Sequence, residues 1–581
     1  MTRLRIKIVG QSGMGLLSVG EMLIDAFNEL GLFVVCDREY PSLIKGGYSC
    51  FTINVSDERI FSLSEFADVM VAIDNVSLNQ YFDFLVKDGV LIHGMEKAIS
   101  IKQISEKAIG KNIKVININA RETSKASGGS VLMQNTVLVG MAWKVLGIDI
   151  GVIETALKKR FEGKINIIET NLRCVKAGYD SVVSENLATG LVKKMSVKKS
   201  EKKFLIDGNK AIALGAINCG VRAYFSYPMS PSSTILSYLA EMSGKTDMII
   251  KQAEDEITAA QMALGAMHMG TRAFAATSGG GYDLMTETVS LAGMLENPLV
   301  IVVGQRPGPA TGLPTWTMQG DLNLAVFSSH GEFPRIVLAV SDPIDAFYLI
   351  QHAFNFAEKF QIPVIVLSEK TICEGKINVL PYDENAVDIE RGLVSEEELK
   401  DIKREDRYAL TETGVSKRWL SGDSEVYYFA NGDEHFVDGS LTEEADEVEK
   451  MYEKRMRKIE TIKKTLPKPE IFGEKNADIS FVGWGSSKNV MIDTIAICLE
   501  KGVKVNYLHY SFVWPIDGKS LKDFFSKNKN VHLIEENYLG QFGNLAEAEI
   551  QEKFAGRLLK FNGRPFFVED LIDYIDKNSK K

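Results

Sequence analysis

The chain has 581 residues and a formal net charge of −10, with 45% hydrophobic and 25% charged residues. At roughly 100–200 residues per domain, this length predicts about three or four domains. The acidic balance argues against a general nucleic-acid-binding protein. No apolar run approaches the ~20 residues of a membrane span. We therefore expect a cytoplasmic globular protein that binds neither nucleic acid nor membranes.

The six cysteines are scattered and form no Cys-x-x-Cys pair; they are Cys36, Cys50, Cys174, Cys219, Cys373 and Cys498. We expect them to be buried thiols rather than disulfides. A ferredoxin-type cluster requires closely spaced thiolates, so any iron–sulfur centre used with this chain would sit on another chain. The seven histidines show no metal-ligand spacing, and no metal site is expected here.

Residues 1–192 are predicted to form a first α/β domain. A buried strand at 4–9 leads into a glycine turn at 10–15 (GQSGMG) and an amphipathic helix at 16–30. Further strands are expected at 33–36, 50–55, 69–73 and 90–93. A glycine turn before a helix can bind a phosphate group, and an ordinary tight turn explains the pattern equally well.

A lysine-rich linker at 193–203 precedes a second α/β domain at 204–375. Residues 376–470 are predicted to form a charged connecting segment, with a solvent-facing helix at 443–464. A third α/β domain is expected at 471–581. The alternation of strands and helices predicts three doubly wound parallel-sheet domains, with ligands bound at the carboxyl ends of the strands.

Three unusual motifs follow one another in the second domain. Residues 252–256 (QAEDE) open a helix rich in alanine and glycine. Residues 276–281 (ATSGGG) and 304–314 (GQRPGPATGLP) each follow a short apolar strand. An acid, a glycine turn and an arginine loop at strand ends are typical of a cofactor cleft.

Each motif also has a purely structural explanation. Acids in the first turn of a helix interact favourably with its dipole whether or not they are catalytic. Glycines allow close backbone approach in any tight turn. The prolines around Ser230 stiffen a loop whose serines can cap a helix, and Arg306 could be a surface residue. The residues alone leave these alternatives open.

In their order, the three motifs resemble the thiamine-pyrimidine-binding domain of the 2-oxoacid:ferredoxin oxidoreductases. Residues 227–233 (YPMSPSS) are similar to the family's Tyr-Pro-Ile-Thr-Pro-Ser-Ser, with Ser230 in place of threonine. Residues 305–315 (QRPGPATGLPT) are close to the family's form. The resemblance implies an alpha subunit that takes part in CoA-dependent oxidative decarboxylation of a 2-oxoacid to acyl-CoA and CO₂, with reduction of ferredoxin.

The resemblance extends over nearly the whole chain. In the first domain, residues 38–41 (REYP) and 45–49 (KGGYS) are similar to motifs of the family's gamma domain. In the third, residues 482–487 (VGWGSS) and 535–541 (EENYLGQ) resemble its transketolase-C-terminal-like domain. We therefore expect a gamma domain fused to an alpha subunit.

The resemblance also implies roles for individual residues. Glu256 would hydrogen-bond the aminopyrimidine of thiamine diphosphate and so promote loss of the C2 proton, with Glu254 as the second candidate. The expected cofactor-binding residues are Glu256, Glu254, Thr277, Ser278 and Gly279. The expected catalytic residues are Glu256, Arg306 and Ser230. The expected substrate-binding residues are Ser230, Pro231, Arg306, Thr311 and Trp316.

Residues 315–319 (TWTMQ) depart from the family's Thr-(Arg or Lys)-x-Glu-Gln, because Trp316 and Met318 replace a cation and an acid. If the lost cation holds a second carboxylate, an apolar or aromatic 2-oxoacid is expected rather than 2-oxoglutarate. The chain also lacks the Gly-Asp-Gly…Asn-Asn pattern that holds the cofactor diphosphate through a metal ion. The resemblance therefore implies a beta subunit that carries this half of the site, Mg²⁺ and a [4Fe-4S] cluster, in an (αβ)₂ hetero-oligomer.

Two other hypotheses remain at this point. The chain could be a thiamine-dependent transketolase-like or decarboxylase subunit without redox chemistry, whose partner would lack cysteine clusters. It could instead be a nucleotide-binding or scaffolding protein built on the N-terminal glycine turn, with no dependence on thiamine.

Overall fold

The computed structural model describes residues 3–43, 46–95, 108–183, 195 and 202–579. Lys45 of the predicted gamma motif lies outside these residues, as do four lysines of the predicted linker, Lys193, Lys194, Lys198 and Lys199. The chain divides into two compact units: residues 1–206, 374–381 and 567–573 form the first, and residues 207–373, 382–566 and 574–581 form the second. Within the described ranges, no helix is long and apolar enough to cross a bilayer.

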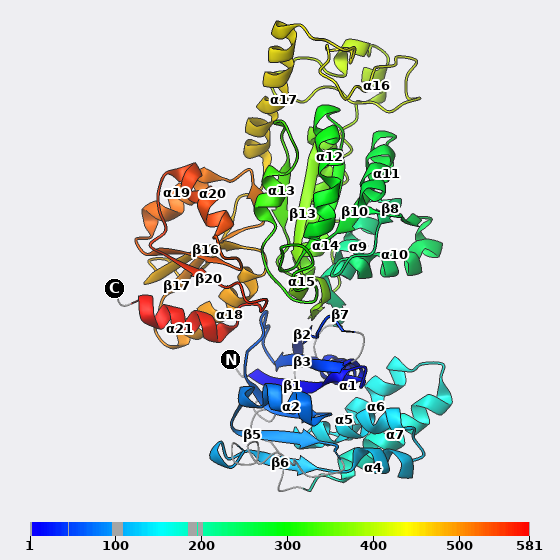
Figure 1. The fold of residues 1–581 in the computed structure, drawn as a ribbon, viewed down its shortest axis with the longest axis vertical. Helices are drawn as coiled ribbons and strands as arrows, with labels where there is room; N and C mark the ends of the chain where they lie inside the picture. The colour runs from blue at the N-terminus through cyan, green and yellow to red at the C-terminus, as the bar shows by residue number, and fades with distance from the viewer. Residues whose placement is uncertain (1–2, 44–45, 96–107, 184–194, 196–201, 580–581) are drawn as a thin grey trace. The chain divides into compact units, whose positions relative to one another are not determined.

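An eight-stranded sheet forms the centre of the first unit (Figure 1). In spatial order its strands are β6 (Lys114–Asn117), β5 (Leu85–His93), β4 (Ala67–Ala72), β1 (Arg3–Ser12), β3 (Gly46–Ser56), β2 (Phe33–Glu39), β14 (Lys376–Val379) and β7 (Phe204–Asp207). The sheet is mixed rather than purely parallel: β1, β4, β5 and β6 are parallel, whereas β3 runs antiparallel to both β1 and β2. The connection between β2 and β3 is too short for a crossover, and so the two strands pair antiparallel.

Helices complete the first unit and bury its sheet. They are α1 (Leu16–Glu29), α2 (Asn75–Tyr81), α4 (Ala120–Ala126), α5 (Gln134–Val145), α6 (Ile150–Arg160) and α7 (Ile165–Asp180). The amphipathic pattern predicted at 16–30 is confirmed, because α1 buries its apolar face in the core around Phe27 and Trp143. All six cysteines of the chain are buried free thiols, as predicted.

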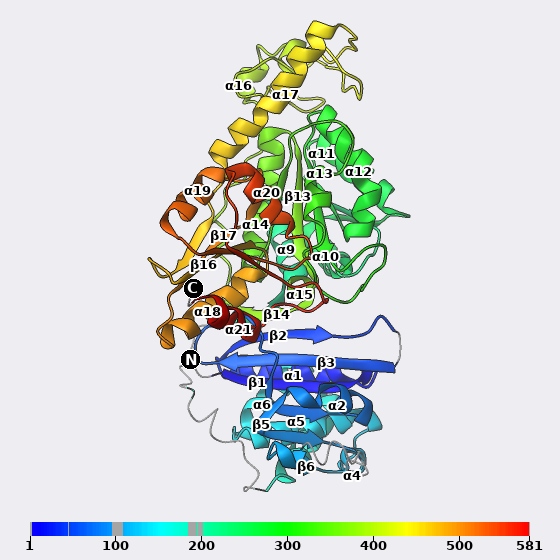
Figure 2. The ribbon, with the colours of Figure 1, turned by 60° about the vertical axis from the view of Figure 1, so that its left-hand side comes forward.

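The second unit contains a seven-stranded sheet with helices on both faces (Figures 1 and 2). Its strands, in order, are β18 (Phe512–Trp514), β12 (Ile336–Ala339), β13 (Pro363–Glu369), β11 (Leu299–Gln305), β10 (Ala273–Thr277), β8 (Ala223–Ser226) and β9 (Ile249–Gln252). All are parallel except β18. Helices α11 (Glu256–His268) and α12 (Gly279–Met294) pack together on one face, and α9 (Gly208–Asn218) packs with α14 (Pro343–Phe360) on the other.

A five-stranded sheet follows in the same unit. Its order is β15 (Glu470–Gly473), β17 (Val505–Tyr510), β16 (Ile479–Trp484), β19 (Val531–Glu535) and β20 (Gly556–Leu559). The other α-helices of the described residues are α10 (Ser233–Thr246), α13 (Leu322–Phe327), α15 (Lys370–Glu374), α16 (Glu396–Leu399), α17 (Ala445–Thr465), α18 (Ser487–Glu500), α19 (Gly518–Lys527), α20 (Gln541–Ile550) and α21 (Val568–Asn578). One hydrophobic core includes residues of both sheets, from Ala260 and Val303 to Trp484 and Phe542.

The helix predicted at 443–464 exists as α17, but one of its faces is buried rather than exposed to solvent. Lys454 and Lys458 are both fully buried, and their amines lie 2.5 and 2.6 Å from the carboxyl oxygens of Glu296 at the end of α12. A buried lysine is tolerated only when its charge is paired, and the sequence pattern did not reveal this distant partner. The pairing fixes the charged segment to the seven-stranded sheet.

Candidate active site

The predicted site residues gather at one edge of the seven-stranded sheet. Strands β8, β9, β10 and β11 are parallel neighbours, so their carboxyl ends lie at the same edge. Ser230 and Glu256 follow β8 and β9, Thr277 ends β10, and Arg306 follows β11. Four motifs separated by up to 76 residues in the chain, the separation of Ser230 and Arg306, therefore meet along this edge.

Glu256 is the first residue of α11 and its side chain is buried, at 4% exposure. The preceding Asp255 caps the helix by accepting a hydrogen bond from the Thr258 amide at 2.7 Å, so the cap does not require Glu256. The Oε1 atom of Glu256 is buried without a hydrogen-bond partner. Glu254, the second candidate, is exposed.

The carboxyl group of Glu256 lies against the first turn of α12. A Cβ atom on Gly281 would stand 2.0 Å from Thr277 Oγ1 and 2.7 Å from Glu256 Oε1, so only glycine permits this approach. Thr277 and Ser278 are fully buried, and the Ser278 hydroxyl donates to the Met229 sulfur at 2.6 Å. The turn predicted to hold a cofactor is thus packed directly against the predicted catalytic acid.

Arg306 and the Ser230 loop are in direct contact. The Nη1 group of Arg306 donates a hydrogen bond to the Ser230 carbonyl oxygen at 2.8 Å. The amide of Asn209 donates to the Pro231 carbonyl at 2.8 Å and holds the loop from the other side. Burial lowers the pKa of Arg306, and the nearby Asp321 carboxylate opposes that shift. The guanidinium thus lies beside a loop that is held through its backbone carbonyl groups.

The two other predicted substrate contacts lie farther along the Arg306 loop. Thr311 is exposed, and Trp316 is half-buried. The guanidinium carbon of Arg564 lies 3.3 Å from the centroid of the Trp316 ring, which is a close cation–π stack. A cation from the C-terminal part of the chain therefore lies beside the position where the loop itself lacks one.

Two further polar residues at this edge were not predicted. The Nε2 atom of Gln305 and the Oδ2 atom of Asp321 are both buried without a hydrogen-bond partner. Burial, followed by the charge of Asp283, raises the pKa of Asp321 to about 7. Gln305 and Asp321 stand at the two ends of the arginine loop in sequence. An amide and an acid at these two positions are the only sequence feature that could have indicated them as site residues.

Glu256, Gln305 and Asp321 each leave a polar atom unpaired at the same sheet edge. Buried polar groups in native proteins are nearly always hydrogen-bonded, so such a group of exceptions marks a place where a ligand completes the bonding. The donor set fits an aminopyrimidine, because a carboxyl oxygen is available for a ring nitrogen beside a glycine turn. The residues present therefore fit the pyrimidine half of thiamine diphosphate.

Gln319 holds the far end of the arginine loop. Its Nε2 group donates to Glu369 Oε1 at 2.8 Å and to the Trp484 carbonyl at 2.9 Å, and its Oε1 accepts from the Glu536 amide at 2.8 Å. Burial raises the pKa of Glu369, although hydrogen bonds from Ser486 and Gln319 oppose the shift. The loop that carries Arg306 is thus anchored on the ends of strands from the five-stranded sheet.

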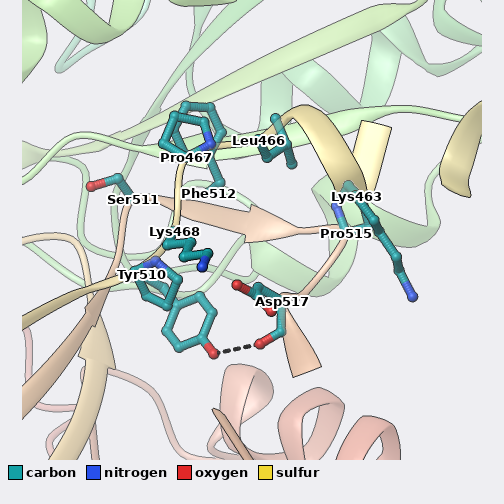
Figure 3. A pocket seen from close by; sticks show the side chains of 10 residues that line it. Lys463, Leu466, Pro467, Lys468, Tyr510, Ser511, Phe512, Pro515 and Asp517 are labelled. Atoms are coloured by element: carbon teal, nitrogen blue, oxygen red, sulfur yellow. Dashed lines mark hydrogen bonds between the residues drawn. The ribbon is translucent and has the colours of Figure 1, made fainter. Parts of the chain in front are cut away.

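Two hollows elsewhere in the second unit do not involve these residues. One of about 20 Å³ lies where β17 passes into β18, lined by residues that include Tyr510 and Asp517 (Figure 3). That volume holds roughly one water molecule. Another, of about 260 Å³, lies between α12 and α17 and is lined in part by Glu287 and Arg455.

Family models match both parts of the chain. The model for the thiamine-diphosphate-binding domain of pyruvate flavodoxin/ferredoxin oxidoreductase matches residues 214–430, and the model for pyruvate ferredoxin/flavodoxin oxidoreductase matches residues 5–181. The first match includes every predicted site residue. Together with the sheet edge described above, these matches define a thiamine-diphosphate-binding subunit of an oxidoreductase.

Similar proteins narrow this class to a family. A Sulfolobus 2-oxoacid:ferredoxin oxidoreductase alpha subunit is 32% identical, and the match covers 99% of this chain and 97% of that protein. The 2-oxoglutarate synthase subunit KorA of Archaeoglobus fulgidus is 32% identical over 58% of this chain and 88% of its own. The structure of 2-oxoglutarate:ferredoxin oxidoreductase from Magnetococcus marinus, with 2-oxoglutarate, coenzyme A and succinyl-CoA bound, has a TM-score of 0.90 at 27% identity and covers 100% of both chains. The chain belongs to the 2-oxoacid:ferredoxin oxidoreductase alpha subunits, with a gamma-like domain at its N-terminus.

Proposed function

We propose that this chain supplies the pyrimidine half of a thiamine diphosphate site in a CoA-dependent 2-oxoacid:ferredoxin oxidoreductase. The reaction converts a 2-oxoacid, CoA and two oxidised ferredoxins into acyl-CoA, CO₂, two reduced ferredoxins and one proton. The observation that carries the proposal is the buried Glu256 carboxyl group, whose Oε1 lacks a partner at the sheet edge that also holds Arg306. A non-redox thiamine enzyme agrees less well with the family to which the chain belongs.

In this proposal the Glu256 carboxyl group hydrogen-bonds the pyrimidine ring of thiamine diphosphate. The turn formed by Thr277, Ser278 and Gly279 lies beside that ring. Thiamine diphosphate, when bound, supplies a carbon nucleophile and takes up the electron pair freed by decarboxylation. Glu256 holds the proton that a ring nitrogen shares with its carboxyl group. The glycine turn excludes water from that hydrogen bond, because Thr277 and Ser278 are fully buried.

Arg306 and Ser230 orient the substrate. A guanidinium binds a carboxylate through paired, charge-assisted hydrogen bonds, and Arg306 retains donors beyond the one given to the Ser230 carbonyl. The Ser230 hydroxyl is proposed to contact the 2-oxo group, with Pro231 and Thr311 in the surrounding loop. Trp316 would favour an apolar 2-oxoacid, whereas Arg564, which lies on its ring, brings a cation that suits a second carboxylate. Both apolar 2-oxoacids and 2-oxoglutarate are therefore substrates to compare.

The rest of the active site is proposed to lie on a partner. A beta subunit would bind the diphosphate through Mg²⁺, carry a [4Fe-4S] cluster and pass electrons to ferredoxin, in an (αβ)₂ assembly. The names of the relatives, which are called alpha subunits, support an assembly of several subunits. The cytoplasmic location and the domain boundaries at 192, 203, 375 and 470 stay predictions.

The test is to isolate the chain with its partners from its native cell. Thiamine diphosphate and iron contents are measured on the complex, together with viologen reduction that depends on CoA and on each of pyruvate, 2-oxoglutarate, branched-chain and aryl 2-oxoacids. The proposal expects an iron-bearing partner, bound thiamine and reduction with at least one acid. Thiamine without iron would favour the non-redox alternative, and the absence of thiamine and of reduction would favour nucleotide binding by residues 1–190.

A further inference from the structure

Asp321 is a second carboxyl group at the candidate site. It follows the arginine loop and precedes α13, and its backbone amide donates to the Gln305 side-chain oxygen at 3.1 Å. Both carboxyl oxygens lie 2.6 Å from the position that a Cβ atom on Gly279 would occupy. Asp321 therefore packs against the same first turn of α12 that Glu256 contacts through Gly281.

The carboxyl group of Asp321 is not satisfied by the protein alone. Its Oδ2 atom is buried without a hydrogen-bond partner, and so is the Nε2 atom of the neighbouring Gln305. A buried carboxylate that lacks donors loses much of its stabilisation. A structural carboxylate in this position would be expected to have those donors, so the arrangement is better suited to a group that meets a ligand.

Two charged groups act on Asp321. Asp283 on the exposed side of α12 disfavours its ionised form, and Arg306, which follows β11, favours it. Burial is the largest influence, and it also favours the neutral acid. With a pKa of about 7, the Asp321 carboxyl group titrates near neutral pH. A modest change in the local charge is then enough to protonate or to deprotonate Asp321.

We propose that Asp321 is a positioning residue that binds the substrate carboxylate beside Arg306 in its protonated form, so that binding of the 2-oxoacid takes up a proton at Asp321. The incoming carboxylate is a like charge, which favours the neutral acid, and a protonated carboxyl group can donate an O–H hydrogen bond to it. This inference rests on the proposed function, because it requires a 2-oxoacid at Arg306.

The proton balance closes over the cycle. One proton passes from solvent to Asp321 as the carboxylate binds, up to the fraction that was ionised before. When the carboxylate leaves as neutral CO₂, the like charge is gone, and Asp321 ionises again beside Arg306 and returns the proton to solvent. Arg306 and neutral Asp321 would therefore hold the carboxylate before decarboxylation. Asp321 would ionise once the carboxylate has left.

The experiment uses the isolated complex and a 2-hydroxyacid that corresponds to its best substrate, because this analogue keeps the carboxylate but has no oxo group to react. Calorimetric titrations in buffers of different ionisation enthalpy give the protons taken up on binding. With Asp321 at a pKa of about 7, about 0.5 proton is expected at pH 7. Above pH 7 the affinity of the native complex should fall, by up to about tenfold per pH unit.

Asp321→Asn carries an N–H donor at every pH. Its proton uptake should vanish and its affinity should stay constant from pH 6.5 to about 8.5, while the thermal unfolding midpoint reports on folding. Asp283→Asn removes the like charge and should move the uptake to lower pH, which tests the inference even if Asp321→Asn does not fold. Glu287→Gln, on the same helix and exposed, is the matched control and should leave the uptake unchanged.

The outcomes separate the two proposals. If the native complex oxidises a 2-oxoacid and binds the analogue without proton uptake, or if Asp321→Asn shows the same uptake, the role of Asp321 is wrong and the proposed function stands. If the complex neither oxidises any 2-oxoacid nor binds any 2-hydroxyacid, both proposals are overturned.

Discussion

The Oε1 atom of Glu256 lies 2.7 Å from the point where a side chain on Gly281 would begin. The two residues belong to different helices, α11 and α12, and they meet because each helix starts at the same sheet edge. Because Gly281 has no side chain, the Glu256 carboxyl group can lie against the first turn of α12. Burial of Glu256 keeps most solvent away from that carboxyl group.

Gly281→Ala should damage the site through this contact. The new methyl group would overlap Thr277 Oγ1 and press on Glu256, at an expected cost of roughly 1–3 kcal/mol in unfolding free energy. Thiamine diphosphate retained by the purified complex should fall as well. Gly280→Ala is the matched control, because nothing lies within 4 Å of its Cβ position. Equal cofactor contents in the two variants would contradict the predicted role of the contact.

Glu256→Gln should lower 2-oxoacid-dependent viologen reduction by roughly 10²–10⁴-fold, because the amide cannot share a proton with the cofactor as a carboxyl group does. Glu254→Gln changes an exposed acid two residues away and should leave the rate near that of the native complex. Thermal unfolding midpoints should be similar for both. A larger loss in Glu254→Gln would reassign the catalytic acid.

Arg306→Lys keeps the positive charge but loses the paired geometry and the bond to the Ser230 carbonyl. We expect KM for the 2-oxoacid to rise by roughly 10- to 100-fold, the loss of one or two charge-assisted hydrogen bonds. Steady-state kinetics with varied 2-oxoacid at saturating CoA measure this effect. The exposed Arg222→Lys serves as the control, and an unchanged KM in Arg306→Lys would exclude a carboxylate contact.

Glu296→Gln should destabilise the protein by roughly 3–5 kcal/mol, because Lys454 and Lys458 would lose their buried counter-charge. The two lysines hold the pKa of Glu296 well below its ordinary value despite its burial. Its contribution is therefore present above about pH 4.5 and is lost as the pH falls. Thermal unfolding midpoints of the native and variant proteins should differ by a similar amount from pH 5 to pH 8, and the difference should begin to shrink only below about pH 4.5.

A lysine of the same cluster gives a pH dependence in the same direction, but in a higher pH range. Burial lowers the pKa of Lys454 to about 7, below its unfolded value of 10.5, so its contribution makes the protein more stable as the pH rises between those values. Glu447→Gln removes a partner of Lys450 from a half-buried position at the surface and should change little at any pH. If Glu447→Gln and Glu296→Gln lowered the unfolding midpoint equally, the burial of the Glu296 cluster would be contradicted.

Gln319→Ala should loosen the arginine loop. The side chain makes three hydrogen bonds to buried partners at Glu369, Trp484 and Glu536, and each unsatisfied group costs about 1–3 kcal/mol. The unfolding midpoint should fall by several degrees, and KM for the 2-oxoacid should rise with it. Gln261→Ala, which loses a single bond to Thr288, is the control for both measurements.

The alternation of strands and helices, and the position of Ser230, Glu256, Thr277 and Arg306 at strand ends, could be predicted from the sequence, because parallel strands place their carboxyl ends together. The mixed first sheet was not predicted, since the alternation of elements does not reveal which neighbours pair antiparallel. The prediction of a charged, exposed helix at α17 was wrong for the face that carries Lys454.

Asp321 and Gln319 show what a linear pattern omits. Both lie at the end of a loop in which the sequence indicated only Arg306, Thr311 and Trp316 as site residues. The unpaired state of Asp321 and the saturation of Gln319 depend on groups more than 30 residues away, such as Gly279, Glu369 and Glu536. Sequence spacing carries no information about such partners until the fold is known.

The anchoring of Gln319 and the stacking of Arg564 on Trp316 have a consequence for chimeric enzymes. A graft that exchanges residues 204–375 with a relative would separate the arginine loop from the C-terminal residues that contact it. Recombination between relatives should therefore transfer the loop together with residues 484–486, 535–537 and 563–564. Directed evolution toward a different 2-oxoacid should therefore vary the loop and these C-terminal residues together rather than the loop alone.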